Sequence, residues 1–160
     1  MEHLLSMLTM SDQEIIDVLD LADKIKAEVK QGVFKPYLKN KTIGLIFQKA
    51  STRTRVSFEV GAVQLGAYPL HLDASTMQIG RGEPIQDTAR VLSRYLDGIM
   101  IRTYAQKDVE DLAKYGSIPI INGLTDFAHP CQVLADLQTI REHKGKLAGL
   151  KMVFIGDGNN

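Results

Sequence analysis

Short apolar runs that alternate with helical patterns constrain the fold of this chain of 160 residues more than any other feature. The run at 42–47, Thr-Ile-Gly-Leu-Ile-Phe, is uncharged and partly β-branched, which is typical of a strand buried on both faces of a parallel sheet. Similar runs lie at 68–72, 98–101, 118–121 and 150–155. The alternation predicts an α/β fold, a parallel β-sheet flanked by helices on both faces and joined by right-handed crossovers.

Local signals mark where the helices between these runs begin and end. Ser11 and Glu14 have the spacing of a capping box, and apolar residues follow at helical period until Gly32. The polar segment 73–83 is predicted to be a loop, and loops of this length are often functional. Further helices are predicted from Thr52 or Arg53 to Gly66, after Pro84, over 108–115 and over 130–143.

Composition argues against several classes of protein. The 19 basic and 19 acidic residues give a formal net charge of zero, so no global field attracts nucleic acid or an acidic membrane. The single cysteine, Cys131, excludes an internal disulfide framework, and the scattered histidines make no zinc pattern. No apolar run reaches membrane-spanning length, and Glu2 lies where a signal peptide carries positive charge. We therefore expect a cytoplasmic protein with no nucleic-acid or membrane partner and no bound metal.

The junction after the first run carries the most specific chemistry. Residues 51–55, Ser-Thr-Arg-Thr-Arg, place three hydroxyls and two guanidiniums where a strand gives way to a helix. The free N–H groups of a helix N-terminus, the helix dipole and an arginine fork together suit a phosphate group. The alternative is an ordinary capped helix whose arginines face water. For Arg55 the spacing to Glu59 favours that alternative, as an ion pair along the helix.

Other polar residues follow runs that end at the same edge of the predicted sheet. Arg102 follows the third run, and His129 and Gln132 begin the helix after the fourth. Ligands bind beyond the carboxyl ends of the strands in such sheets, so these side chains are candidates for one site. The alternatives are a surface salt bridge for Arg102 and a helix cap for His129. Cys131 is expected to be a buried structural residue and not a nucleophile.

Four stretches of the chain form a specific combination: Phe-Gln-Lys-Ala-Ser-Thr-Arg-Thr-Arg at 47–55, Ser-Phe-Glu at 57–59, Asp-Thr-Ala-Arg at 87–90 and His-Pro-Cys-Gln at 129–132. This combination resembles the aspartate and ornithine carbamoyltransferase family. The resemblance covers nearly the whole chain, but only the amino-terminal half of a family member. Cys131 after His-Pro, and a loop at 78–83 that lacks lysine, resemble the ornithine branch. A relative with putrescine, aspartate or another amine as acceptor is the alternative.

The resemblance implies a role for each candidate residue. Thr54, Arg102 and His129 would be catalytic, because they would polarise the carbonyl group. Gln78 would serve the site of a neighbouring subunit in a homotrimer, and Asn160 would contact ornithine. The carbamoyl-phosphate site would comprise Ser51, Thr52, Arg53, Thr54, Gln78, Arg102, His129 and Gln132.

The resemblance also implies a division of the chain and a reaction. Residues 1–149 would form a carbamoyl-phosphate-binding domain that includes the interdomain helix, and 150–160 would be the first strand of a truncated ornithine-binding domain. The reaction would transfer the carbamoyl group from carbamoyl phosphate to L-ornithine, giving L-citrulline and phosphate without a metal or organic cofactor. Because most of the second domain is missing, we expect the isolated chain to lack useful turnover. The alternatives from other classes are a non-catalytic anion- or nucleotide-binding module and a domain used only for assembly.

Overall fold

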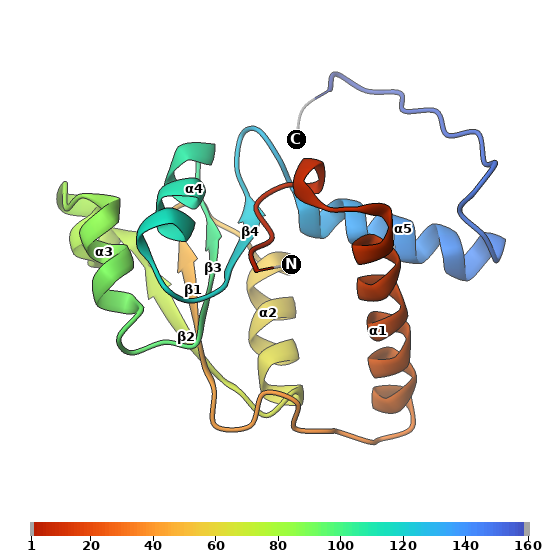
Figure 1. Cartoon of the computed structure of the whole chain (residues 1–160), viewed down its shortest axis with the longest axis horizontal. Coiled ribbons are helices and arrows are strands. Elements are labelled where there is room, and N and C mark those ends of the chain that lie inside the picture. The colour runs from red at the N-terminus through yellow and green to blue at the C-terminus, as the bar shows by residue number, and fades with distance from the viewer. Residues whose placement is uncertain (1, 159–160) are drawn as a thin grey trace.

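The computed structural model describes residues 2–158, and within this range the chain forms a four-stranded sheet and five α-helices (Figure 1). The strands are β1 (Thr42–Phe47), β2 (Tyr68–Asp73), β3 (Gly98–Arg102) and β4 (Ile120–Leu124). Their order is β2-β1-β3-β4, and every neighbouring pair is parallel. The helices are α1 (Asp12–Lys30), α2 (Arg53–Gln64), α3 (Ile85–Leu92), α4 (Gln106–Tyr115) and α5 (Pro130–Lys144). The predicted α/β fold is confirmed.

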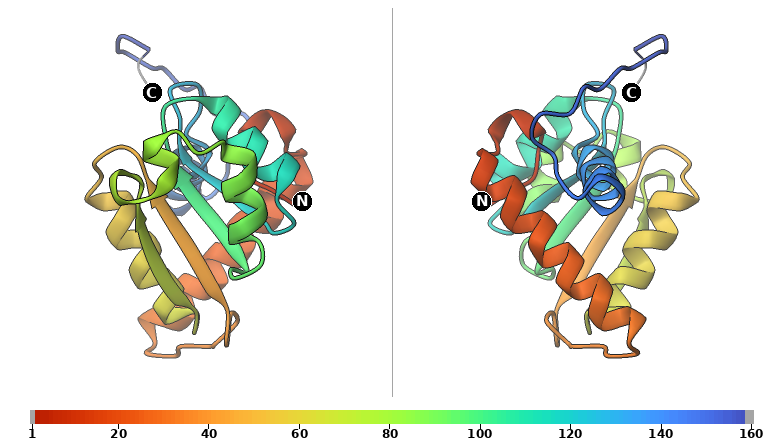
Figure 2. Two further views of the ribbon diagram at one scale, coloured as in Figure 1. Left: turned by 90° about the vertical axis from the view of Figure 1, so that its left-hand side faces the viewer. Right: turned by 90° about the vertical axis from the view of Figure 1, so that its right-hand side faces the viewer.

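Helices cover both faces of the sheet. α3 and α4 lie together on one face, whereas α1, α2 and α5 lie on the other (Figures 1 and 2). Successive side chains of β1 point to opposite faces, so Ile46 packs in a cluster with residues of α3 and α4, while Leu45 and Phe47 pack with Phe58 of α2. None of the helices within 2–158 is long and apolar enough to cross a membrane.

α1 is joined to α5 by charged side chains. Arg141 of α5 donates hydrogen bonds to Asp20 and Asp23 of α1, each at 2.6 Å, and Lys26 pairs with Glu142 at 2.6 Å. α5 in turn contacts β4. This docking fixes the direction of α5, whose N-terminus belongs to the site described below.

The amino-terminal segment extends the sheet beyond β4. The Leu4 N–H donates to the Ile120 carbonyl, and the Leu4 carbonyl accepts from the Asn122 N–H, both at 2.8 Å. The side-chain amide of Asn122, which is fully buried, donates to the Leu5 carbonyl at 2.9 Å. These contacts allow a polar side chain to occupy a buried position in β4.

Several element boundaries differ from the expectation. The fourth strand is Ile120–Leu124 and not 118–121, because the internal hydrogen bonds of Asn122 let the strand continue through it. The expected loop 73–83 contains two 3₁₀ turns, η2 (Ala74–Thr76) and η3 (Gln78–Arg81). The predicted capping box of Ser11 and Glu14 at the start of α1 is confirmed.

The prediction of a fifth strand at 150–155 is wrong. These residues form no helix or strand, and in Figure 1 the chain after α5 forms an extended arc outside the sheet and the helices. An apolar segment becomes a strand only where a neighbouring strand pairs with its N–H and C=O groups, and within 2–158 no strand pairs with it. Its large apolar side chains are exposed instead: Met152, Val153, Phe154 and Ile155.

Candidate active site

The parallel register brings the carboxyl ends of the four strands into line. Phe47 at the end of β1 is the register partner of Asp73 in β2 and of Arg102 in β3, and Arg102 is paired in turn with Leu124 in β4. Each strand end continues into a loop, so the loops after β1, β3 and β4 begin side by side. This edge is where the predicted site residues were expected to meet.

α2 begins at this edge without a side-chain cap. The N-cap residue Thr52 has helical backbone angles, φ −89° and ψ −57°, and its side chain makes no capping hydrogen bond. The Val56 N–H donates to the Thr52 carbonyl at 3.0 Å and is the first donor of a hydrogen bond inside the helix, so the N–H groups of residues 53–55 have no acceptor within the helix. The positive end of the helix dipole is therefore open to an anion.

A cleft of about 470 Å³ lies between this helix N-terminus and the ends of β3 and β4. Its lining contains residues from three loops that are far apart in the sequence. Seven of the predicted site residues line it: Ser51, Thr52, Arg53, Thr54, Arg102, His129 and Gln132. The structure therefore gathers the candidates of the first, third and fourth strand ends into one hollow.

Two predicted site residues are not among the residues that line this cleft. Gln78 is exposed and lies in η3, on the segment between β2 and α3. Asn160 lies outside the described residues. Their predicted roles therefore stay predictions.

Arg102 and His129 carry polar atoms that are buried at the cleft without a protein partner. Within the described residues, neither Arg102 Nε nor His129 Nδ1 takes part in a hydrogen bond. Buried polar atoms are nearly always paired. Four exceptions occur in the described part of the chain. Asn122 Oδ1 and Arg141 Nε are not in the lining of the cleft, whereas Arg102 and His129 both line it, which fits groups kept for a ligand. Burial lowers the pKa of His129 below its ordinary value, and the Arg102 charge lowers it further. A neutral imidazole beside an arginine can donate to a carbonyl oxygen while the arginine binds phosphate.

A buried polar network fixes the loop that precedes His129. The Thr125 N–H donates to the Ala128 carbonyl at 2.9 Å, and the Ala128 N–H donates to Thr125 Oγ1 at 3.0 Å. Gln106 Oε1 accepts from Thr125 Oγ1 at 2.8 Å and from Asn122 Nδ2 at 3.3 Å. The position of the histidine is thus determined by β4 and by the start of α4.

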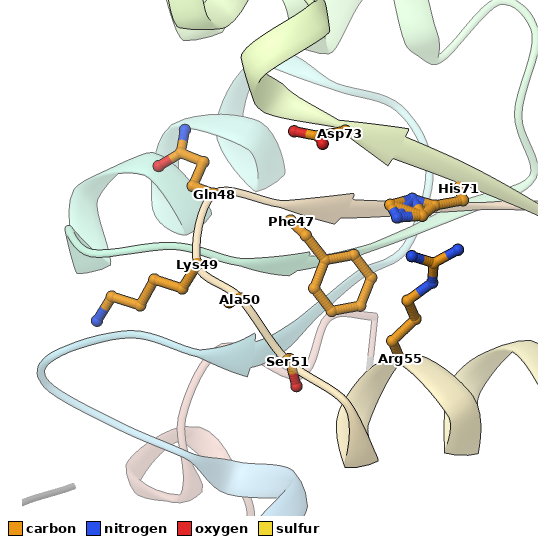
Figure 3. A pocket seen from close by; sticks show the side chains of 8 residues that line it. All are labelled: Phe47, Gln48, Lys49, Ala50, Ser51, Arg55, His71 and Asp73. Atoms are coloured by element: carbon orange, nitrogen blue, oxygen red, sulfur yellow. The ribbon is translucent and has the colours of Figure 1, made fainter.

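A smaller hollow of about 270 Å³ lies beside the cleft, across the loop that follows β1 (Figure 3). In Figure 3 the Arg55 guanidinium faces the His71 ring, whose centroid is 5.5 Å from that of Phe47. Arg55 Nε donates to Glu59 at 2.9 Å, so the predicted ion pair along α2 is confirmed. Sequence reasoning missed His71 and Asp73 in this hollow, although their place at the end of the second run was a usable signal.

Cys131 is not part of the reactive surface. Burial raises the pKa of its thiol to about 11, and Sγ lies 3.4 Å from the Asn122 carbonyl. Cys131 is half-buried, and this geometry fits the expected structural role. Among the described residues there is no group of three or more His, Cys, Asp or Glu side chains that could hold a metal ion.

Comparison with known proteins identifies the family. Residues 2–142 match the family model "Aspartate/ornithine carbamoyltransferase, carbamoyl-P binding domain". The chain belongs to this family. The ornithine carbamoyltransferase of Caldicellulosiruptor saccharolyticus is 62% identical to it over 160 residues, which are 100% of this chain and 52% of that protein.

Solved structures of relatives have the same fold as this carbamoyl-phosphate-binding domain. The ornithine carbamoyltransferase from Pyrococcus furiosus superposes with a TM-score of 0.96 at 54% identity, covering 99% of this chain and 51% of that one. The catalytic subunit of M. jannaschii aspartate transcarbamoylase superposes with a TM-score of 0.84 at 33% identity, covering 91% of this chain and 48% of that one. The chain spans about half the length of the relatives that it matches.

Proposed function

We propose that this chain binds carbamoyl phosphate as the amino-terminal domain of an ornithine carbamoyltransferase. The observation that carries the proposal is the cleft that joins the uncapped start of α2 to Arg102 and His129, whose buried polar atoms lack protein partners. An anion bound there meets N–H groups, hydroxyls and guanidiniums from three loops. A phosphate group alone needs no neutral imidazole, so His129 favours a phosphate that carries a carbonyl group.

The proposed roles follow from position in the cleft. Ser51, Thr52, Arg53 and Thr54 bind the phosphate through hydroxyls, the helix N-terminus and one guanidinium. Arg102 bridges the phosphate and the carbonyl oxygen. The remaining polar contacts to the carbamoyl group come from Thr54, His129 and Gln132.

The proposed reaction is acyl transfer. A neutral amine attacks the carbamoyl carbon, and negative charge develops on the carbonyl oxygen. Phosphate leaves with the electrons of the broken C–O bond, and the proton that the amine nitrogen loses goes to the departing phosphate. Thr54, Arg102 and His129 stabilise that charge because they are held in place before the reaction begins. The arginines also neutralise the departing phosphate.

Ornithine as the acceptor is supported by the names of the relatives and by the higher identity to them than to the aspartate enzyme. We propose that residues 1–149 form the carbamoyl-phosphate domain with the interdomain helix, and that 150–160 belong to the ornithine domain, with Asn160 as an ornithine contact. The exposed apolar residues of 150–155 fit a segment that pairs with that second domain. The isolated chain should therefore form no citrulline above background when it is mixed with both substrates.

We further propose a homotrimer in which Gln78 serves the cleft of a neighbouring subunit. Gln78 is exposed and does not line the cleft of its own chain, which fits a residue that acts on another copy. A cytoplasmic location and a role in arginine metabolism belong to the same proposal. Sedimentation measures the assembly directly.

Calorimetric titration tests the binding function. Carbamoyl phosphate and inorganic phosphate should both bind the purified chain, whereas ATP and NAD should not. Arg53→Ala should abolish phosphate binding without changing the sedimentation coefficient. Binding of ATP or NAD with no response to carbamoyl phosphate would instead identify a nucleotide-binding module. Intact phosphate binding with lost assembly in Arg53→Ala would indicate a domain used only for assembly.

A further inference from the structure

Lys49 has an environment that is unusual for a charged residue in a loop. It lies in the loop after β1, and its side chain is only 19% exposed. Its Nζ donates to the Asp126 carboxylate in a short ion pair and lies 4.4 Å from the centroid of the Tyr104 ring. Lysine is rarely covered to this extent unless it is paired.

These contacts join the three loops that carry the proposed site. Lys49 precedes the phosphate-binding residues after β1, Tyr104 follows Arg102 after β3, and Asp126 precedes His129 after β4. The Asp126 N–H also donates to the Tyr104 carbonyl at 2.9 Å, so the partners of Lys49 are already fixed to each other. Lys49 connects the loop after β1 to Tyr104 and Asp126.

The loop after β1 needs such an attachment. The Gln48 N–H donates to the Arg102 carbonyl at 2.9 Å, but within the described residues the N–H groups of residues 49–51 donate to no protein acceptor. The next backbone anchor is the first hydrogen bond of α2. Between these points the Lys49 side chain ties the loop to the loop after β4 through Asp126 and to the loop after β3 through Tyr104.

Lys49 is not itself a wall of the cleft. It is absent from the residues that line the cleft. Lys49 is among the residues that line the smaller hollow, but in Figure 3 its side chain extends away from Arg55 and His71. An effect of Lys49 on ligand binding must therefore pass through the loop or through its electric field.

We propose that Lys49 is a positioning residue, which clamps the phosphate-binding loop onto Tyr104 and Asp126 so that it meets Arg102 and His129 at the spacing the ligand needs. This inference rests on the proposed binding of carbamoyl phosphate. According to this inference, the affinity for carbamoyl phosphate also depends on a residue that does not line the cleft. Lys49 acts through its ion pair with Asp126 and its contact with the Tyr104 ring.

The test measures the affinity of the chain for inorganic phosphate and for fresh carbamoyl phosphate in four variants: Lys49→Met, Asp126→Asn, the double variant and Lys49→Arg. Lys49→Met keeps the length of the stem and loses the charge. We expect it to weaken both ligands by about three- to tenfold, the usual range for coupled side chains. Lys49→Arg should restore most of the affinity, because a guanidinium can pair with the carboxylate and stack on the ring.

Asp126→Asn separates the clamp from a simple field effect. A clamp predicts that Asp126→Asn weakens binding, although it removes a negative charge, and that the double variant is no weaker than either single one. A field effect predicts that Asp126→Asn binds phosphate more tightly, because a negative charge is removed. It also predicts that Lys49→Met lowers the affinity by the same factor whether residue 126 is Asp or Asn. Either of those two results would overturn the proposal.

The chain offers a matched control at the other edge of the sheet. Lys41 pairs with Asp97 at 2.8 Å and joins the start of β1 to the start of β3. Lys41→Met removes the same charge and a similar ion pair about 20 Å away along the strand, which is beyond the screening length. Its phosphate affinity should stay within about twofold of the unchanged chain.

The outcomes also separate this inference from the proposed function. If the unchanged chain binds neither ligand, the proposed function fails before any variant is made. If it binds both and Lys49→Met binds equally well, the clamp fails while the binding function stands. Thermal unfolding of each variant shows whether it is folded, and Asp126→Asn, whose carboxylate is 67% exposed, keeps the test decisive if Lys49→Met does not fold.

Discussion

At the amino edge of the sheet, Asp97 accepts hydrogen bonds from Lys41 Nζ and from the Thr42 N–H, both at 2.8 Å, whereas at the carboxyl edge Arg102 and His129 keep buried nitrogens without a protein partner. The two edges are built by the same four strands and hold similar residue types. They differ in whether the nitrogens named above have hydrogen-bond partners inside the described part of the chain. The difference fits a stabilising role for the amino edge and the ligand site proposed at the carboxyl edge.

The helices show the same difference. α1 begins with a complete capping box, in which Ser11 and Glu14 satisfy each other's backbone groups. α2 begins at the carboxyl edge with no side-chain cap, although Thr52 at its N-cap could have provided one. Unpaired N–H groups in the first turn of a helix cost stability, and an anion that accepts hydrogen bonds from them offsets that cost.

The largest expected effect is that of Arg102→Met, which separates function from stability. Phosphate binding should weaken by at least about 30-fold, because the cleft loses a guanidinium from its centre. The free energy of unfolding should rise by about 1 kcal/mol, because a buried N–H without a partner is removed. Calorimetry and urea unfolding measure the two quantities.

Arg94→Met is the control for this change. Arg94 is exposed and lies between α3 and β3, toward the amino edge. Both its phosphate affinity and its unfolding free energy should equal those of the unchanged chain. A loss of stability in Arg102→Met would mean that the arginine supports the fold and is not reserved for a ligand.

Asp97→Ala should give the reverse pattern at the amino edge. It removes the acceptor of two hydrogen bonds, so the midpoint of thermal unfolding should fall by roughly 3–6 °C while phosphate affinity is kept. The Lys41 ammonium and the Thr42 N–H lower the pKa of this carboxyl in the folded chain. A lowered folded pKa stabilises the fold above the unfolded pKa and loses that effect as the pH falls through the folded value.

The pH series therefore checks the cause. The difference in midpoint between the unchanged chain and Asp97→Ala should be full at neutral pH and should close as the pH falls below the ordinary value of 3.8. A difference that persists in strong acid would assign the effect to packing and not to charge. Weaker phosphate binding in Asp97→Ala would show that the amino edge affects ligand binding as well as stability, which contradicts the distinction between the two edges.

A smaller effect is expected on the titration of His129. Burial and the Arg102 charge lower its pKa, so Arg102→Met should raise it, and bound phosphate should raise it as well. The ring proton signals in an NMR titration report the midpoint, and Arg94→Met should leave it unchanged. Because the folded pKa is lowered, the fold should lose stability as the pH falls below 6.5, and His129→Phe should flatten that slope.

The sequence predicted the residues of the cleft better than it predicted the loops that hold them. The first strand, the start of α2 and the candidates Arg102 and His129 follow from local signals, since a strand end and a helix start are encoded by neighbouring residues. The clamp of Lys49, Tyr104 and Asp126 joins residues 55 and 77 positions apart. No periodicity or cap marks such a contact, because it depends on the register of three strands.

The two errors in strand assignment have one cause. The apolar run at 150–155 has the composition of a strand but finds no neighbour within 2–158, and Asn122 has a polar side chain but finds partners in Leu5 and Gln106. Strand formation depends on partners that are distant in the chain, so composition alone over-predicts the first and under-predicts the second. Helix starts and stops, which depend on near neighbours, were predicted more accurately.

The smallest effect is expected for substitution of Cys131. This residue lies at the carboxyl edge, but its position alone does not make it part of the ligand site. Its thiol lies in the first turn of α5, where a helix dipole favours thiolate, yet burial raises its pKa from the ordinary value of 9.0 to about 11. Iodoacetamide at pH 8 should therefore react about a hundredfold more slowly with the native chain than with the unfolded chain, and Cys131→Ala should change phosphate affinity by less than about twofold. Mass spectrometry of the alkylated peptide measures the rate. Fast alkylation that is blocked by phosphate would show that the thiol lies in the cleft. Cys131 would then belong to the ligand-binding surface and not to the layer beneath it.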